Sequence, residues 1–65
     1  MRDLSRSEYE HLIDEWILSE RDRRLMKRRL LDAITYEKLA EEFDMSVRGV
    51  KYAVSRCRKI LIKHI

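Results

Sequence analysis

The chain has 65 residues, of which 45% are hydrophobic and 42% are charged, and its formal net charge is +3. This length suffices for one small domain, 1–65, and the absence of proline beside a single glycine favours long helices with short connections. One cysteine excludes an internal disulfide, and no apolar run approaches the ~18 residues of a membrane helix or resembles a signal peptide, so we expect a cytoplasmic protein that does not enter membranes.

Charge is distributed unevenly along the chain. Residues 1–20 contain two arginines and six acids, a net charge of −4, whereas residues 21–65 contain thirteen basic residues and six acids, a net charge of +7. From Ser46 onward there are six basic residues and no acid. A helix with charge of one sign is typical of a protein that binds a polyanion. The alternative is a solvated face whose cations stabilise the C-terminal end of a helix.

The first predicted element is an amphipathic helix over 7–17. Ser7 with Glu10, or Ser5 with Glu8, has the spacing of a capping box at its start. Its apolar residues follow the i, i+3, i+4, i+7, i+8 spacing of one helical face. They are Tyr9, Leu12, Ile13, Trp16 and Ile17.

This apolar face has two interpretations. It closes the core over the other helices, or it forms a docking surface for a partner or a second copy of the chain. Tyr9 and Trp16 are the candidate partner-binding residues of the second interpretation.

A second helix is expected over 20–34, after a sharp corner at Leu18. Ser19 followed by Asp22 is a further N-cap signature. The apolar residues of this segment surround much of the helix, which is typical of a central helix with neighbours on two sides. We expect most of its basic residues to be solvated or paired with the acidic first helix, with some of them available to a polyanion.

The remaining residues predict a helix over 36–43, a tight turn and a longer basic helix over 46–62. Thr35 and Ser46 are the predicted N-caps, and Asp44 tolerates the left-handed conformation of a turn. Five apolar residues share one face of the last helix: Val47, Val50, Val54, Cys57 and Leu61. Two helices, a turn and an outward basic face are the ingredients of a DNA-binding helix-turn-helix. The predicted fold is an all-α, four-helix small domain that contains this motif.

The outward face of the last helix supplies the predicted DNA-binding residues. They are Arg48, Lys51, Tyr52, Ser55, Arg56, Arg58 and Lys59. Arg48 and Tyr52, near the N-terminal end of that helix, are the candidates for base contacts, and Arg58 and Lys59 are the candidates for the DNA backbone. In the preceding helix, Glu41 and Glu42 form an acidic patch that is a candidate surface for a protein partner.

Catalytic and metal-binding patterns are absent from the sequence. His11 and His64 lie at opposite ends, and a single cysteine offers no zinc-ligand spacing. Gly49 is the only glycine, so there is no glycine-rich phosphate loop. Cys57 lies on the apolar face and is expected to be a small buried hydrophobe. We therefore expect no enzyme, no metal and no cofactor.

Segment 18–61, about two-thirds of the chain, resembles region 4 of the sigma-70 family, which recognises the −35 promoter element. The matching motifs are LSERDR at 18–23, TYEKLAE at 35–41, SVRGVK at 46–51 and RCRKIL at 56–61. The resemblance implies a region 4-like helix-turn-helix over 19–65, preceded by an accessory amphipathic helix over 1–18. It implies a sequence-specific transcriptional regulator that binds double-stranded DNA. Nothing resembles the region that melts the −10 element, so we do not expect a complete sigma factor.

The same resemblance implies an alternative function, because region 4 also contacts core RNA polymerase. A chain of this kind is then a protein-interaction module, a decoy or co-activator with weak or no DNA binding. Gly49 favours this alternative, since many family members place a polar base-contacting residue at that position. A homodimer closed by the N-terminal helix is a third hypothesis.

Overall fold

Four helices and no strand make up residues 4–64, the part of the chain that the computed structural model describes. The helices are α1 (Arg6–Trp16), α2 (Glu20–Leu30), α3 (Tyr36–Glu42) and α4 (Val47–Ile62). The prediction of a small all-α domain of four helices is therefore confirmed.

A hydroxyl side chain caps the start of each helix. Ser5, Ser19, Thr35 and Ser46 each accept a hydrogen bond from the backbone N–H three residues later, at 3.0–3.3 Å. The Glu8 carboxylate also accepts the Ser5 N–H at 3.0 Å, which completes a capping box. Of the two predicted boxes, the one at Ser5 is therefore formed. For this reason α1 begins one residue earlier than predicted, at Arg6. It also ends one residue earlier, at Trp16, where the C-cap Ile17 is extended.

The second helix is shorter than predicted, ending at Leu30 and not at residue 34. Ala33 adopts a left-handed conformation with φ of 53°, and the Ile34 N–H turns back to the carbonyl of Arg28 at 3.2 Å. Ile34 still packs against the core, but it does so from the loop. The apolar spacing predicted the burial of Leu25 and Met26 and the core packing of Leu30 and Ile34, but Ala33 is exposed. It was wrong as a measure of helix length, because a loop can also deliver an apolar side chain to the core.

The connection between α3 and α4 is a tight turn centred on Asp44. Asp44 has a left-handed φ of 53°, as predicted. The Met45 N–H bonds to the Ala40 carbonyl at 2.9 Å, and the Asp44 N–H points to the Glu41 carbonyl at 3.4 Å. These two bonds form a Schellman motif, which satisfies carbonyls at the end of α3. The turn fixes where α4 begins, with Ser46 as its cap.

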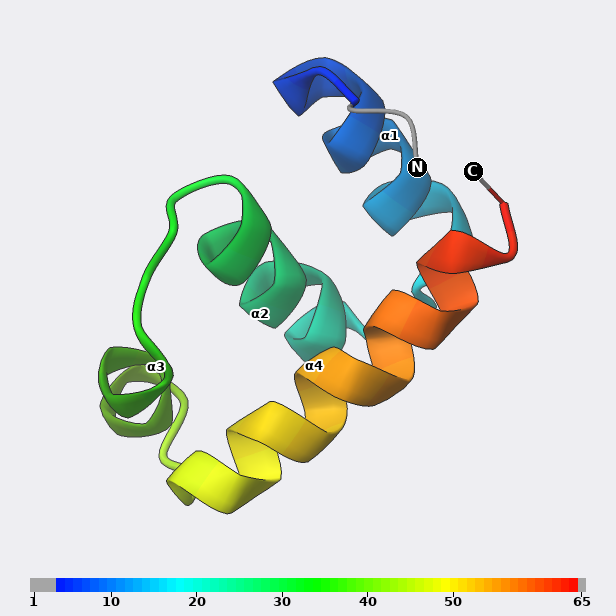
Figure 1. The fold of residues 1–65 in the computed structure, drawn as a ribbon. Helices are drawn as coiled ribbons and strands as arrows, with labels where there is room; N and C mark the ends of the chain where they lie inside the picture. Colours follow the sequence, from blue (N-terminus) through cyan, green and yellow to red (C-terminus); the bar gives the residue numbers. More distant parts are fainter. Residues whose placement is uncertain (1–3, 65) are drawn as a thin grey trace.

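One cluster of buried side chains joins the four helices. α2 lies at the centre and contacts the other three helices, while α4 runs beside it and also contacts all three (Figure 1). α1 and α3 lie at opposite ends of the fold and do not pack on each other. The buried apolar residues are Ile13, Ile17, Leu25, Met26, Leu39, Ala40, Val50, Ala53, Val54, Cys57 and Leu61.

The core confirms most of the predicted apolar face of the last helix and part of that of the first, where Trp16 is 39% exposed and Tyr9 lies outside the core cluster. Ile13 and Ile17 are buried, so α1 and its C-cap cover the end of the core that is formed by α2 and α4. On α4 the predicted face is buried except for Val47, which is half-buried and packs at the edge of the core. The opposite side of α4 is consequently left to solvent.

Candidate nucleic-acid interface

The candidate interface is the solvent-facing side of α4. The helix has 16 residues, contains no acid and starts at a well-formed cap, in which the Ser46 hydroxyl accepts the Gly49 N–H at 3.0 Å. A Cβ atom at position 49 would lie 3.1 Å from the Ser46 Oγ atom. Glycine at this position therefore leaves room for the capping hydroxyl.

All seven residues predicted to bind DNA are exposed. Arg48, Tyr52, Ser55 and Lys59 follow one another at intervals of four, three and four, so they form the centre of the exposed face. Tyr52 is 69% exposed, although it is a large aromatic residue. An exposed aromatic ring among cations offers both a stacking surface and a hydroxyl to a ligand.

Three of the five cations of α4 have no internal partner among residues 4–64. Arg48, Arg58 and Lys59 form no ion pair and no cation–π contact with any residue between 4 and 64. Their positive charges are therefore available to an external anion.

The six cations of α2 behave differently, because each of them contacts a partner within the molecule. Arg21 pairs with Asp22, Arg23 donates to the Ile17 carbonyl, Arg24 lies over the Phe43 ring, Lys27 pairs with Asp14, Arg28 pairs with Glu42 and Asp32, and Arg29 donates to the Ile34 carbonyl. Only Lys27 pairs with α1, at 2.7 Å from the Asp14 carboxylate. The expected pairing of α2 with the acidic first helix is thus limited to one ion pair. The other five cations contact acids, backbone carbonyls or an aromatic ring outside α1.

Lys51 marks the edge of the exposed face on the side of α3. Its Nζ atom lies 5.7 Å from the centre of the Tyr36 ring, and the Arg29 guanidinium lies 4.1 Å from the same centre. Two cations therefore share the Tyr36 ring. This contact joins α2, α3 and α4 at one point.

Arg56 marks the opposite edge and is tied to a buried acid. Its guanidinium donates to the Asp22 carboxylate at 2.8 Å, and Arg21 donates to the same carboxylate at 3.3 Å. Asp22 is only 4% exposed, whereas the Arg56 side chain is 53% exposed. Arg56 is thus both a member of the exposed basic face and the partner of a buried charge. Sequence reasoning missed this pair, because Asp22 was explained as a cap residue and the two residues are 34 positions apart.

The four predicted partner-binding residues do not form one surface. Trp16 is 39% exposed and Tyr9 is half-buried, both on α1, whereas Glu41 and Glu42 lie at the end of α3. Glu42 pairs with Arg28 at 3.0 Å, while Glu41 is exposed. Because α1 and α3 lie at opposite ends of the fold, a single partner would meet only one of these pairs.

The Trp16 ring has a neighbour that the sequence did not suggest. His64 stacks on it, with 3.6 Å between ring centres and 3° between the ring planes. The stack brings the end of α4 onto the end of α1. The two histidines remain apart in the fold. His64 packs against the indole of Trp16, and His11 lies on the surface beside Glu15.

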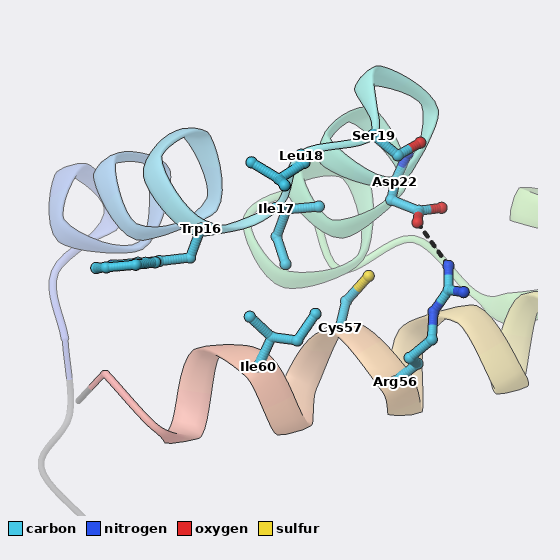
Figure 2. A pocket seen from close by; sticks show the side chains of 8 residues that line it. All are labelled: Trp16, Ile17, Leu18, Ser19, Asp22, Arg56, Cys57 and Ile60. Carbon is cyan, nitrogen blue, oxygen red and sulfur yellow. Dashed lines mark hydrogen bonds and ion pairs between the residues drawn. The ribbon is translucent and has the colours of Figure 1, made fainter.

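A hollow of about 280 Å³ lies where the α1–α2 corner faces the second half of α4 (Figure 2). Its lining residues are Trp16, Ile17, Leu18, Ser19, Asp22, Arg56, Cys57 and Ile60. Figure 2 shows Trp16 and Ile60 at one end and the Asp22–Arg56 ion pair at the other. Burial raises the pKa of the Cys57 thiol, so this group stays protonated at neutral pH and behaves as the predicted small hydrophobe.

Residues 4–64 contain no group of three or more His, Cys, Asp or Glu side chains that could hold a metal ion. Over the same residues, no helix is long and apolar enough to cross a membrane. Comparison of the chain with protein-family models, with curated proteins and with solved structures found no match.

Proposed function

We propose that the chain is a sequence-specific DNA-binding transcriptional regulator, in which α3, the Asp44 turn and α4 act as a helix-turn-helix similar to sigma region 4. In this proposal α4 is the recognition helix and lies in the major groove. α3 lies across the DNA backbone, where only its N-terminal end approaches phosphates. The acids at its far end, Glu41 and Glu42, are then directed away from the groove.

One observation carries the proposal: three of the five basic residues of α4 have no internal partner among residues 4–64, whereas all six basic residues of α2 have one. An internal ion pair already offsets the charge of Arg28 or Lys27. Arg48, Arg58 and Lys59 are exposed on a helix without an acid, so they add to a positive potential that phosphates neutralise. The excess of positive charge in the second part of the sequence thus lies on the exposed face of α4.

The position of each residue along α4 suggests a division of roles. Arg48 and Tyr52 lie in the first half of the helix, the part that reaches base edges in this kind of docking. Arg58 and Lys59 lie in the second half, where the groove turns away and phosphates come near. Lys51, Ser55 and Arg56 complete the face between them.

The test is fluorescence anisotropy of a labelled DNA duplex of about 30 base pairs at two salt concentrations, first with random sequence and then with a site obtained by selection. The wild-type protein should bind random DNA in the micromolar range at low salt and lose affinity steeply as salt rises. Arg48→Ala should lower affinity for the selected site by about 1–3 kcal/mol, whereas Lys59→Ala should weaken binding to all duplexes alike.

Lys27→Ala is the matched control, because it removes the same charge from α2, where Lys27 is paired with Asp14. Its affinity for DNA should stay within about twofold of the wild type, because Lys27 lies outside the exposed face of α4 and Asp14 already offsets its charge. Equal losses for Lys27→Ala and Lys59→Ala would show that net charge, and not the face of α4, determines binding. No binding at low salt would contradict the proposal itself.

A second candidate function is an interaction module that binds core RNA polymerase. It is favoured by Glu41 and Asp44, which are exposed at the end of α3 and have no ion-pair partner among residues 4–64. Capture of polymerase from a lysate by the wild type, lost in Glu41→Lys and retained in Arg48→Ala, would support this function. Absence of polymerase at every salt concentration would count against it.

A further inference from the structure

The surface beside the hollow carries the most exposed large apolar residue of residues 4–64. Leu18 is 84% exposed and stands on the rim of the hollow, in the corner between α1 and α2 (Figure 2). The floor and far wall of the hollow are apolar as well, with Ile17, Cys57 and Ile60. A projecting leucine and an apolar recess thus lie side by side on one face of the same molecule.

The charges on the two edges of this face are opposite in sign. On the α2 edge, Glu20 follows Leu18 closely in the chain, at the first position of the helix. On the α4 edge, Arg56 and Lys63 lie one turn on either side of Ile60. Glu20 and Lys63 are exposed and form no ion pair with another residue between 4 and 64. Arg56 is already paired with Asp22 on the lining of the hollow, so the unpaired charges of this face are Glu20 beside the projection and Lys63 beside the recess.

A surface of this kind is complementary to itself. Rotation by 180° about an axis between projection and recess brings each leucine over the other copy's recess, and each acidic edge over the other copy's basic edge.

We propose that the chain forms a two-fold symmetric dimer through this face, with Leu18 of each copy seated in the hollow of the other. Glu20 of one copy then faces Lys63 of the other. The contact is made by the α1–α2 corner and the second half of α4, and not by the exposed face of α1. The dimer does not depend on DNA binding, but it leaves the centre of the basic face of α4 free in both copies and so presents two basic faces on one particle.

The experiment is sedimentation equilibrium of the full chain between about 20 and about 500 µM, a range in which weak dimers are detected. The wild type should dimerise within this range. Leu18→Glu should weaken the dimer by at least about tenfold, because it places a charge in an apolar recess. Ile62→Glu is the matched control, since Ile62 is 50% exposed on α4 but does not line the hollow; its dimerisation should stay within about twofold of the wild type.

Charge reversal identifies the orientation of the two copies. Glu20→Lys and Lys63→Glu should each weaken the dimer, and the double variant should restore most of the loss, because the reversed charges again face each other. Trp16, the only tryptophan, lies at the end of the hollow and reports association independently through its fluorescence during dilution.

A wild-type protein that is strictly monomeric at about 500 µM would overturn the proposal. The hollow would then be a candidate site for a different protein. A dimer that Leu18→Glu does not weaken, or that Ile62→Glu weakens equally, would overturn it as well, because the contact would then lie elsewhere. Circular dichroism of each variant confirms that the helices are intact before these comparisons are made.

Discussion

The ion pair between Arg56 and Asp22 predicts that the exposed partner is the more costly one to remove. Asp22 accepts hydrogen bonds from Arg56 at 2.8 Å and from Arg21 at 3.3 Å. Its side chain is 5% exposed, whereas the two arginine side chains are 53% and 55% exposed. Arg56→Met keeps the length of the side chain and its helix propensity but removes the charge. It leaves a buried carboxylate with only the longer of its two hydrogen bonds.

Removing one partner of a fully buried pair costs about 3–5 kcal/mol. Here Arg21 remains and the guanidinium groups are already half in water, so we expect Arg56→Met to reduce the free energy of unfolding by about 2 kcal/mol. Asp22→Asn should reduce it by only about 1 kcal/mol, because the released arginines return to water and no charge is left buried. In a domain of this size, about 1 kcal/mol corresponds to a change in Tm of roughly 4–8 °C.

Urea unfolding followed by far-UV circular dichroism measures these free energies, provided that the slope with denaturant stays constant. Lys59→Met is the control, because it removes an unpaired cation from the same helix and should change stability by less than about 0.5 kcal/mol. In the double variant Asp22→Asn/Arg56→Met the losses should be less than additive. An Arg56→Met variant that is as stable as Lys59→Met, or more stable than Asp22→Asn, would refute the reasoning.

Two further predictions concern the backbone and the response to acid. Ala33→Gly and Asp44→Gly should each stabilise the fold by about 0.5–1 kcal/mol, since both positions have left-handed φ values of 53°. The gain should be larger at Ala33, because Asp tolerates that conformation better than Ala. A loss of stability at both positions would contradict the assigned turns. The Arg6 guanidinium, and then Arg28, hold the pKa of Asp32 below its ordinary value of 3.8, so Asp32 contributes stability that is present above that value and is lost as the pH falls through the lowered pKa. Thermal melts between about pH 5 and about pH 2 should therefore show a smaller acid-induced fall in Tm for Asp32→Asn than for the wild type, and identical falls would exclude this contribution.

Much of the fold follows from local patterns in the sequence. Ser19, Thr35 and Ser46 were predicted caps and are observed caps, because an N-cap bond reaches only three residues along the chain. The apolar face of α4 and the exposure of its basic residues were predicted from helical spacing alone, and the left-handed turn at Asp44 from the chemistry of its side chain. In each case the interacting atoms are close in sequence.

The end of α2 and the partners of its cations were decided by tertiary structure. The spacing of Leu30, Leu31 and Ile34 is equally compatible with a longer helix, and only the packing of Ile34 from a loop distinguishes the two. Whether an arginine is free or paired depends on which helix lies opposite, and Arg28 meets Glu42 only because α3 folds back onto α2.

By itself, the sequence determined which segments are helical, which faces are apolar and which helix carries only positive charge, because these properties arise from neighbours within four residues. Tertiary structure decided that every cation of α2 has a partner within the molecule, whereas Arg48, Arg58 and Lys59 of α4 have none among residues 4–64. It also decided that Arg56 pairs with the buried Asp22 and that Leu18 stands beside a hollow. These features depend on how the helices cross, and a crossing is set by the shape of the whole core.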